Sequence, residues 1–150
     1  MTESWRAHLL ETDDQITALL ERVRTIAVLG IKTPDTAAPA HFVPEYAQRA
    51  GYVIYPVPVY YPELTEMLGE RVYREVRAID DRVDLVDVFR RPKDLPAHLD
   101  DLLAARPRAV WFQLGIRNDE VARELAQSGI DVVQDRCLLV ELKQRGIGPS

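Results

Sequence analysis

The stretch Thr25-Ile26-Ala27-Val28-Leu29-Gly30 decides the fold. Its apolar run has no polar alternation, which is typical of a strand that is covered on both faces in a parallel sheet flanked by helices. The run stops at Gly30, where the chain has to turn. In doubly wound α/β folds, the turn after such a strand brings a phosphate group to backbone N–H groups and a helix N-terminus. The stretch therefore predicts a ligand-binding turn at Gly30.

Composition limits the class of protein. A chain of 150 residues, with 47% apolar and 29% charged residues, fits one globular domain and not a disordered or fibrous chain. The single cysteine, Cys137, allows no internal disulfide, which suits a reducing cytoplasm. We find no signal-peptide core and no apolar run long enough to span a membrane. The net charge of −5 disfavours nucleic acid as a partner, so we expect a cytoplasmic protein with no membrane partner.

Further helical and extended patterns alternate along the chain. A capping box at Thr12 begins a helix over residues 13–22, and Gly51 ends a second one. Helices are predicted over 13–22, 41–50, 93–105, 119–127 and 137–144, and strands over 25–30, 52–57, 71–73, 83–89, 109–114 and 130–133. The pattern predicts an α/β fold: a single doubly wound, mostly parallel Rossmann-like sheet with helices on both faces. We expect residues 1–12 to be an N-terminal appendage and 13–150 to be the domain.

Basic side chains follow four of the predicted strands. They are Lys32, Arg90 with Arg91, Arg117 and Arg136. Because the carboxyl ends of parallel strands meet at one edge of the sheet, these groups could together bind a polyanion. The alternative is that they are ordinary solvated turn residues, and their placement alone favours neither interpretation.

The familiar nucleotide motifs are missing. Gly30 is not followed by the further glycines of an NAD-binding turn, and the second strand ends in Tyr55-Pro56-Val57-Pro58 without the acidic residue that holds the ribose. The sequence also lacks the glycine-rich lysine motif of an ATP-hydrolysing P-loop. A nucleotide, if bound, is held in a different manner.

Six segments carry a family resemblance. They are Ile-Ala-Val-Leu-Gly (26–30), Pro-Ala-His-Phe-Val (39–43), Gly-Tyr-Val-Ile-Tyr-Pro-Val (51–57), Val-Asp-Leu-Val-Asp-Val-Phe-Arg-Arg-Pro (83–92), Val-Trp-Phe-Gln-Leu-Gly-Ile (110–116) and Asp-Arg-Cys-Leu-Leu-Val-Glu (135–141). In this order they resemble the small stand-alone CoA-binding proteins. The Rossmann-type domain of that family is similar to the CoA-binding domain of the succinyl-CoA synthetase alpha subunit. The resemblance covers residues 25–143, nearly the whole chain.

The resemblance implies coenzyme A as the ligand. It places the diphosphate near Gly30, Ile31 and Lys32, the adenosine near Val57, the pocket wall at Phe89, Arg90 and Arg91, and the pantetheine arm near Gln113, Gly115 and Ile116. Two positions depart from the family: Pro58 stands where an asparagine is usual, and Ala38 where an arginine is common. We also expect a valine at position 30 to abolish binding, because it blocks the phosphate, while leaving the fold largely intact.

Several side chains allow two interpretations. Cys137, beside Arg136, is either a thiol that forms a mixed disulfide with CoA or a small packing residue. His41 either donates to a phosphate or is structural. Asp84 and Asp87 are three apart on a strand and point to opposite faces, which spoils them as a catalytic pair, and Asp135 is expected to fix its loop. No histidine spacing indicates a metal site.

These observations favour non-catalytic binding of coenzyme A or an acyl-CoA at the carboxyl ends of the strands. The protein would act as a carrier, a sensor or an accessory protein. The alternatives are a nucleotide-dependent oxidoreductase or a partner subunit of a CoA ligase, and an interaction module with a vestigial pocket. Tyr60 and Tyr61 would permit a homodimer interface without showing one.

Overall fold

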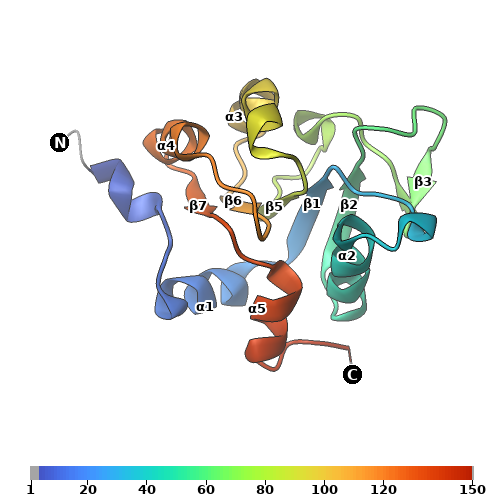
Figure 1. Cartoon of the computed structure of the whole chain (residues 1–150), viewed down its shortest axis with the longest axis horizontal. Coiled ribbons are helices and arrows are strands. Elements are labelled where there is room, and N and C mark those ends of the chain that lie inside the picture. The colour runs from blue at the N-terminus through green and yellow to red at the C-terminus, as the bar shows by residue number, and fades with distance from the viewer. Residues whose placement is uncertain (1–3, 150) are drawn as a thin grey trace.

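The computed structural model describes residues 4–149 and has a five-stranded sheet at its centre (Figure 1). The strands are β1 (Thr25–Leu29), β2 (Val53–Val57), β5 (Leu85–Val88), β6 (Ala109–Phe112) and β7 (Asp131–Val133). They are all parallel and lie in the order β2-β1-β5-β6-β7. The predicted single, doubly wound parallel sheet is confirmed.

Helices cover both faces of this sheet. On one face lie α1 (Asp13–Arg22), α2 (Pro39–Arg49) and α5 (Leu138–Gln144), and on the other α3 (Leu99–Ala105) and α4 (Asp119–Gln127) (Figure 1). The side chains of Ile26 and Val28 belong to the core under α1, and those of Ala27 and Leu29 to the core under α3. Because both faces of β1 are buried, its sequence has no polar alternation.

The start of α1 follows the predicted capping box. The Thr12 hydroxyl accepts the N–H of Gln15 at 3.1 Å, and the Gln15 side-chain oxygen accepts the N–H of Thr12 at 3.0 Å. These two bonds satisfy N–H groups that the first turn of a helix leaves without a partner. Ile16, Leu19 and Leu20 then face the core.

Two predicted elements differ in the structure. The helix expected over 93–105 is a 3-10 helix over Pro92–His98 that continues into α3, because Pro96 has no N–H for an α-helical bond. The short strand expected over 71–73 is instead a hairpin of β3 (Glu66–Met67) and β4 (Glu70–Arg71). Leu68 and Gly69 make its tight turn with positive φ angles of 54° and 75°. Two further 3-10 turns are Pro34–Thr36 and Val76–Ala78.

The segment before α1 lies along the free edge of β7. A 3-10 helix over Ser4–His8 is followed by Leu9, which pairs in parallel with Val132. Leu10 donates its N–H to the Val132 carbonyl at 2.9 Å, so the edge of the sheet is partly covered. Residues 1–3 of the expected appendage lie outside the described residues. Across residues 4–149, every helix is too short or too polar to cross a membrane.

Candidate functional site

The strand order fixes where a ligand would bind. From β1 the chain crosses one face to β2, and the next parallel strand, β5, lies on the other side of β1. Connections that leave in opposite directions open a crevice at the carboxyl ends of β1 and β5, and open α/β sheets bind ligands there. Gly30 and Phe89 immediately follow these two strands. The structure therefore brings the stretch that decides the fold to the ligand end of the sheet.

Gly30 allows the two strand ends to approach each other. Its φ is +88°, and a Cβ at this position would collide with the backbone carbonyl of Phe89 and come within 3.3 Å of the Arg90 side chain. Phe89 in turn donates its N–H to the Leu29 carbonyl at 2.9 Å. The expectation that a valine at position 30 would leave the fold intact is wrong, because its side chain would meet protein backbone before any ligand.

Backbone N–H groups at this turn are only partly engaged. Gly30 donates to the Val57 carbonyl at 2.8 Å, and Lys32 donates to the Ala40 carbonyl at 3.1 Å. Between them, the Ile31 N–H has no acceptor within residues 4–149. The bond from Lys32 holds this turn against the start of α2, whose N-cap residue, Ala38, makes no side-chain cap. An anion could thus meet the Ile31 N–H and an uncapped helix N-terminus together.

The other residues predicted near the phosphate and the adenosine differ in their burial and in their partners. The Lys32 side chain is half-buried and has no charged partner within the described chain. His41 is buried in the first turn of α2, with its Nε2 atom 3.7 Å from a Glu45 oxygen, which is too long for a hydrogen bond. Val57 is fully buried, so only its backbone lies at the crevice.

The two arginines after β5 approach the same oxygen of Asp94, Arg90 at 3.7 Å and Arg91 at 2.9 Å, but they differ in burial. The Arg90 side chain is 16% exposed, donates from Nε to His98 Nε2 at 3.1 Å and lies over the ring of Tyr60. Burial first, and then the Arg90 charge, lower the pKa of His98, so the neutral imidazole accepts this bond. Arg91 is 68% exposed. Arg90 is therefore the fixed cation of the site.

A pocket of about 420 Å³ lies beside Arg90, at the ends of β1 and β2. Pro58, Arg74 and His98 contribute to its wall. The Arg74 guanidinium donates to three backbone carbonyls, those of Tyr60 (3.2 Å), Tyr61 (2.8 Å) and Leu64 (2.7 Å). No carboxylate within residues 4–149 neutralises it. Sequence reasoning missed Arg74, although it directly follows the short strand predicted over 71–73, and His98, which lies inside the helix predicted over 93–105.

The loop after β6 is tightly fixed. The Gln113 side-chain oxygen accepts the Leu138 N–H at 3.1 Å and so caps α5. Gly115 donates its N–H to Asp135 Oδ1 at 2.7 Å, and the Asp135 N–H donates to the Ile116 carbonyl at 3.1 Å. The expectation that Asp135 fixes its loop is confirmed. The predicted pantetheine residues thus share one rigid loop.

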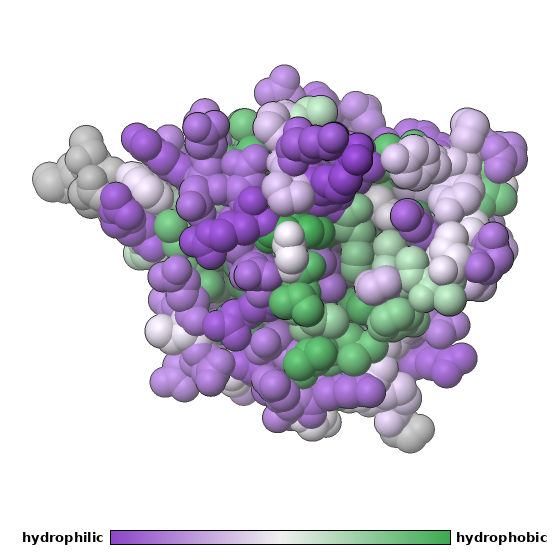
Figure 2. Space-filling view, viewed as in Figure 1, coloured by the Kyte–Doolittle hydropathy of each residue, from purple (hydrophilic) through white to green (hydrophobic). Residues whose placement is uncertain are grey.

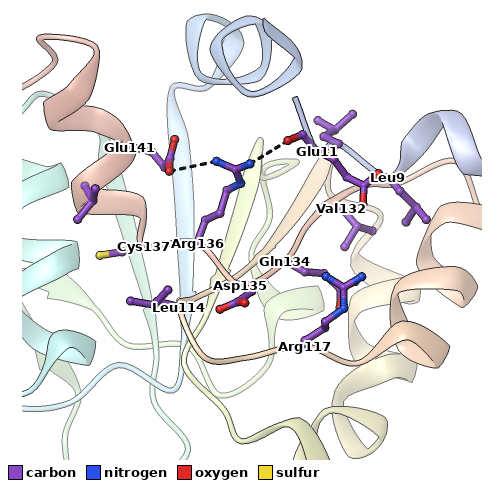
Figure 3. A pocket seen from close by; sticks show the side chains of 12 residues that line it. Leu9, Glu11, Leu114, Arg117, Val132, Gln134, Asp135, Arg136, Cys137 and Glu141 are labelled. Carbon is purple, nitrogen blue, oxygen red and sulfur yellow. Dashed lines mark hydrogen bonds and ion pairs between the residues drawn. The ribbon is translucent and has the colours of Figure 1, made fainter. Parts of the chain in front are cut away.

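The basic residues after β6 and β7 do not join Lys32 and Arg90. Arg117 pairs with Asp119 at 3.1 Å. Figure 3 shows the Arg136 guanidinium between Glu141 and the Glu11 backbone, at 3.4 Å and 2.8 Å. The basic edge expected from the sequence therefore divides into two groups, and only one faces the crevice.

Cys137 lies between these groups at the N-cap of α5. It is half-buried and lines a second pocket, of about 430 Å³, together with Leu114 and Arg136. Its two interpretations, thiol chemistry or packing, both stay predictions. Among the side chains of residues 4–149, no three metal-ligating groups gather at one point.

Comparisons with known proteins agree with this architecture. The sequence profile of a CoA binding domain matches residues 24–143. The uncharacterized protein YneT of Bacillus subtilis (strain 168) is 35% identical over 127 residues, which are 84% of this chain and 90% of that protein. The structure of the cell-free protein ID.343 from Thermus thermophilus is 42% identical, with a TM-score of 0.81 over 89% of this chain and 98% of that one.

A larger enzyme shares the fold. The dinucleotide forming acetyl-coenzyme A synthetase 1 of Ca. Korarchaeum cryptofilum matches 72% of this chain with 25% of its own, at a TM-score of 0.59 and 21% identity. At that identity the likeness concerns the fold alone. The profile match over most of the chain, together with the two closer relatives, shows that this protein belongs to the CoA-binding domain family.

Proposed function

We propose that the protein binds coenzyme A or an acyl-CoA at the carboxyl ends of β1 and β5 and catalyses no reaction by itself. The observation that carries this proposal is the meeting of the unpartnered Ile31 N–H and the uncapped N-terminus of α2 beside the fixed cation Arg90. Backbone N–H groups and a helix N-terminus favour phosphate, and an arginine adds charge-assisted hydrogen bonds. The CoA diphosphate is the group that belongs there.

The adenosine end belongs on the β2 side of the crevice. The pocket beside Pro58 is lined by Arg74 and Arg77 and by the acidic residues Glu75, Asp100 and Asp101. Arg77 pairs with Glu75 and Asp101, whereas Arg74 has no carboxylate partner within residues 4–149, so Arg74 is the charge that suits the 3′-phosphate that distinguishes CoA from dephospho-CoA. Arg74 could thus take over the polar role that the amide missing at position 58 would have had. The end of β2 carries Val57 and Pro58 without an acid for the ribose of NAD, which argues against an oxidoreductase.

Polar side chains around the site already have hydrogen-bond partners within the protein, and this supports binding without catalysis. Asp135 is committed to the Gly115 N–H, Gln113 caps α5, and His98 accepts from Arg90. Each of these bonds shapes the site, and none leaves a general acid or base poised over the crevice. A carrier, sensor or accessory protein would need no more than this.

Calorimetry with CoA, dephospho-CoA, acetyl-CoA and NAD tests the proposal. We expect CoA to bind about tenfold tighter than dephospho-CoA, because a charge-assisted hydrogen bond to the 3′-phosphate is worth about 1.5 kcal/mol or more. NAD should bind most weakly. Tighter binding of NAD than of CoA would favour the oxidoreductase alternative, and the absence of all binding would favour an interaction module with a vestigial pocket.

A further inference from the structure

The second pocket lies at the carboxyl ends of β6 and β7, on the far side of the Gln113–Ile116 loop from the crevice. Its volume is about 430 Å³. Apolar side chains form much of its wall: Leu9, Leu10, Leu114, Val132 and Val140. The segment before α1 supplies the first two of them, so this segment is a wall of the pocket. None of the residues proposed to bind the diphosphate and the adenosine lines this pocket.

Two large apolar side chains stand exposed at this pocket. Leu114 is 68% exposed and Val140 is 44% exposed. Figure 2 shows an apolar patch over α2, α5 and the loops between them, on the face that contains the carboxyl ends of the strands. Exposed apolar surface at a concave site is typical of a place that a ligand or partner covers.

The charges around the pocket leave no free cation for an anionic group. Arg117 pairs with Asp119, and Arg136 with Glu141. In contrast, the carboxylates of Glu11 and Asp135 line the pocket and have no cationic partner within residues 4–149. The pocket therefore disfavours a second carboxylate and accepts an uncharged, apolar group.

The distance from the proposed phosphate site fits the length of the pantetheine arm. Three strand spacings separate β1 from β7, which is about 14 Å at about 4.8 Å each. The pantetheine chain has about as many bonds as four residues of extended polypeptide, which also span about 14 Å. A CoA with its diphosphate at Ile31 thus brings its thiol end to the second pocket.

From these observations we propose that the second pocket holds the acyl group of an acyl-CoA, and that it selects uncharged apolar acyl groups over dicarboxylic ones. This inference rests on the proposed binding of CoA at the crevice. It adds the substrate class: short or branched aliphatic acyl-CoA thioesters, whose hydrocarbon covers Leu114 and Val140. Succinyl-CoA would carry its free carboxylate toward Glu11 and Asp135.

Calorimetry on the wild-type chain with CoA, isovaleryl-CoA and succinyl-CoA tests the selection. Isovaleryl-CoA should bind at least about tenfold tighter than CoA, because several carbon groups leave water. Succinyl-CoA should gain nothing over CoA. The variant Val140→Asp should bind isovaleryl-CoA no tighter than CoA while its affinity for CoA stays that of the wild type.

Val53→Asp is the matched control. Val53 has nearly the same exposure, 46%, but begins β2 at the opposite edge of the sheet. This variant should keep the full preference for isovaleryl-CoA. Equal affinities of the wild type for CoA and isovaleryl-CoA, or tighter binding of succinyl-CoA, would overturn this inference and leave the proposed function standing. Failure to bind any of the three ligands would overturn both.

Discussion

Asp87 should destabilise the folded protein, and its replacement should show by how much. It lies in the middle of β5 between Val28 of β1 and Trp111 of β6, and it is fully buried. Neither of its carboxyl oxygens has a hydrogen-bond partner within residues 4–149. A buried polar group without a partner costs about 1–3 kcal/mol. Because valine is of similar size and suits a strand, Asp87→Val should raise the free energy of unfolding by about that amount at low pH.

The gain in the free energy of unfolding from Asp87→Val should grow with pH. Burial raises the pKa of Asp87 well above its usual value, whereas in the unfolded chain this carboxyl titrates near its usual pKa. As far as Asp87 is concerned, the wild type is therefore most stable below the unfolded-state pKa of this carboxyl, and it loses stability as the pH rises toward the folded-state pKa. Each unit between the two pKa values costs about 1.4 kcal/mol. The gap between Asp87→Val and the wild type should widen above about pH 4, and Asp87→Asn should remove the same pH dependence.

Urea unfolding followed by circular dichroism between about pH 3 and pH 8 measures both effects. Asp84→Val is the matched control, because the Asp84 carboxylate accepts the N–H groups of Arg24 (2.8 Å) and Thr25 (3.1 Å) and pairs with Arg108 (3.2 Å). That variant should lose about 1–3 kcal/mol, the opposite sign. If Asp87→Val is destabilised like Asp84→Val, or if the gap does not change with pH, Asp87 has a partner and the reasoning is refuted.

Three further predictions concern single positions. Gly30→Ala should lose at least about 2 kcal/mol in urea unfolding, because the left-handed φ and the collision with the Phe89 carbonyl add up; unchanged stability would show that the strand ends can separate. Thr12→Ala should lose about 0.5–2 kcal/mol by the same assay, with Thr65→Ala as its control, because Thr65 is exposed and its hydroxyl has no hydrogen-bond partner within residues 4–149; equal losses would mean that the capping box adds nothing. Arg74→Gln should remove the preference for CoA over dephospho-CoA in calorimetry and leave dephospho-CoA binding unchanged, and a retained preference would place the 3′-phosphate elsewhere.

Local sequence signals predicted the elements that carry the fold. The capping box at Thr12 and the uninterrupted apolar run of β1 each depend on neighbours within a few residues, and both are realised. The expectation that Asp84 and Asp87 do not form a pair rests on strand geometry alone; in the structure Asp84 lies just before β5 and accepts backbone N–H groups, and only Asp87 enters the core. Pro96 is also a local signal: its missing N–H delays the start of α3 to Leu99, which the helix predicted over 93–105 does not take into account.

Contacts between distant segments could not be read in this way. The direction of each arginine side chain depends on its hydrogen-bond partner. Arg90 donates to His98, whereas Arg136 donates to the backbone carbonyl of Glu11, which is 125 residues away in the sequence. The contribution of Arg74 comes from carbonyls of a loop without periodicity. The role of Gly30 as a point of contact with Phe89 likewise depends on the packing of two strand ends, which the sequence around the glycine does not contain.

Amide NMR during a titration with CoA tests the central claim most directly. If CoA binds at the ends of β1 and β5, the largest shifts should be those of the Ile31 and Ala40 amides, together with the Arg90 side-chain Nε–H signal. Amides at the amino ends of the strands, such as that of Val53 at the start of β2, should not move. Shifts confined to the amino ends, or an unchanged Ile31 amide at saturating CoA, would contradict the account.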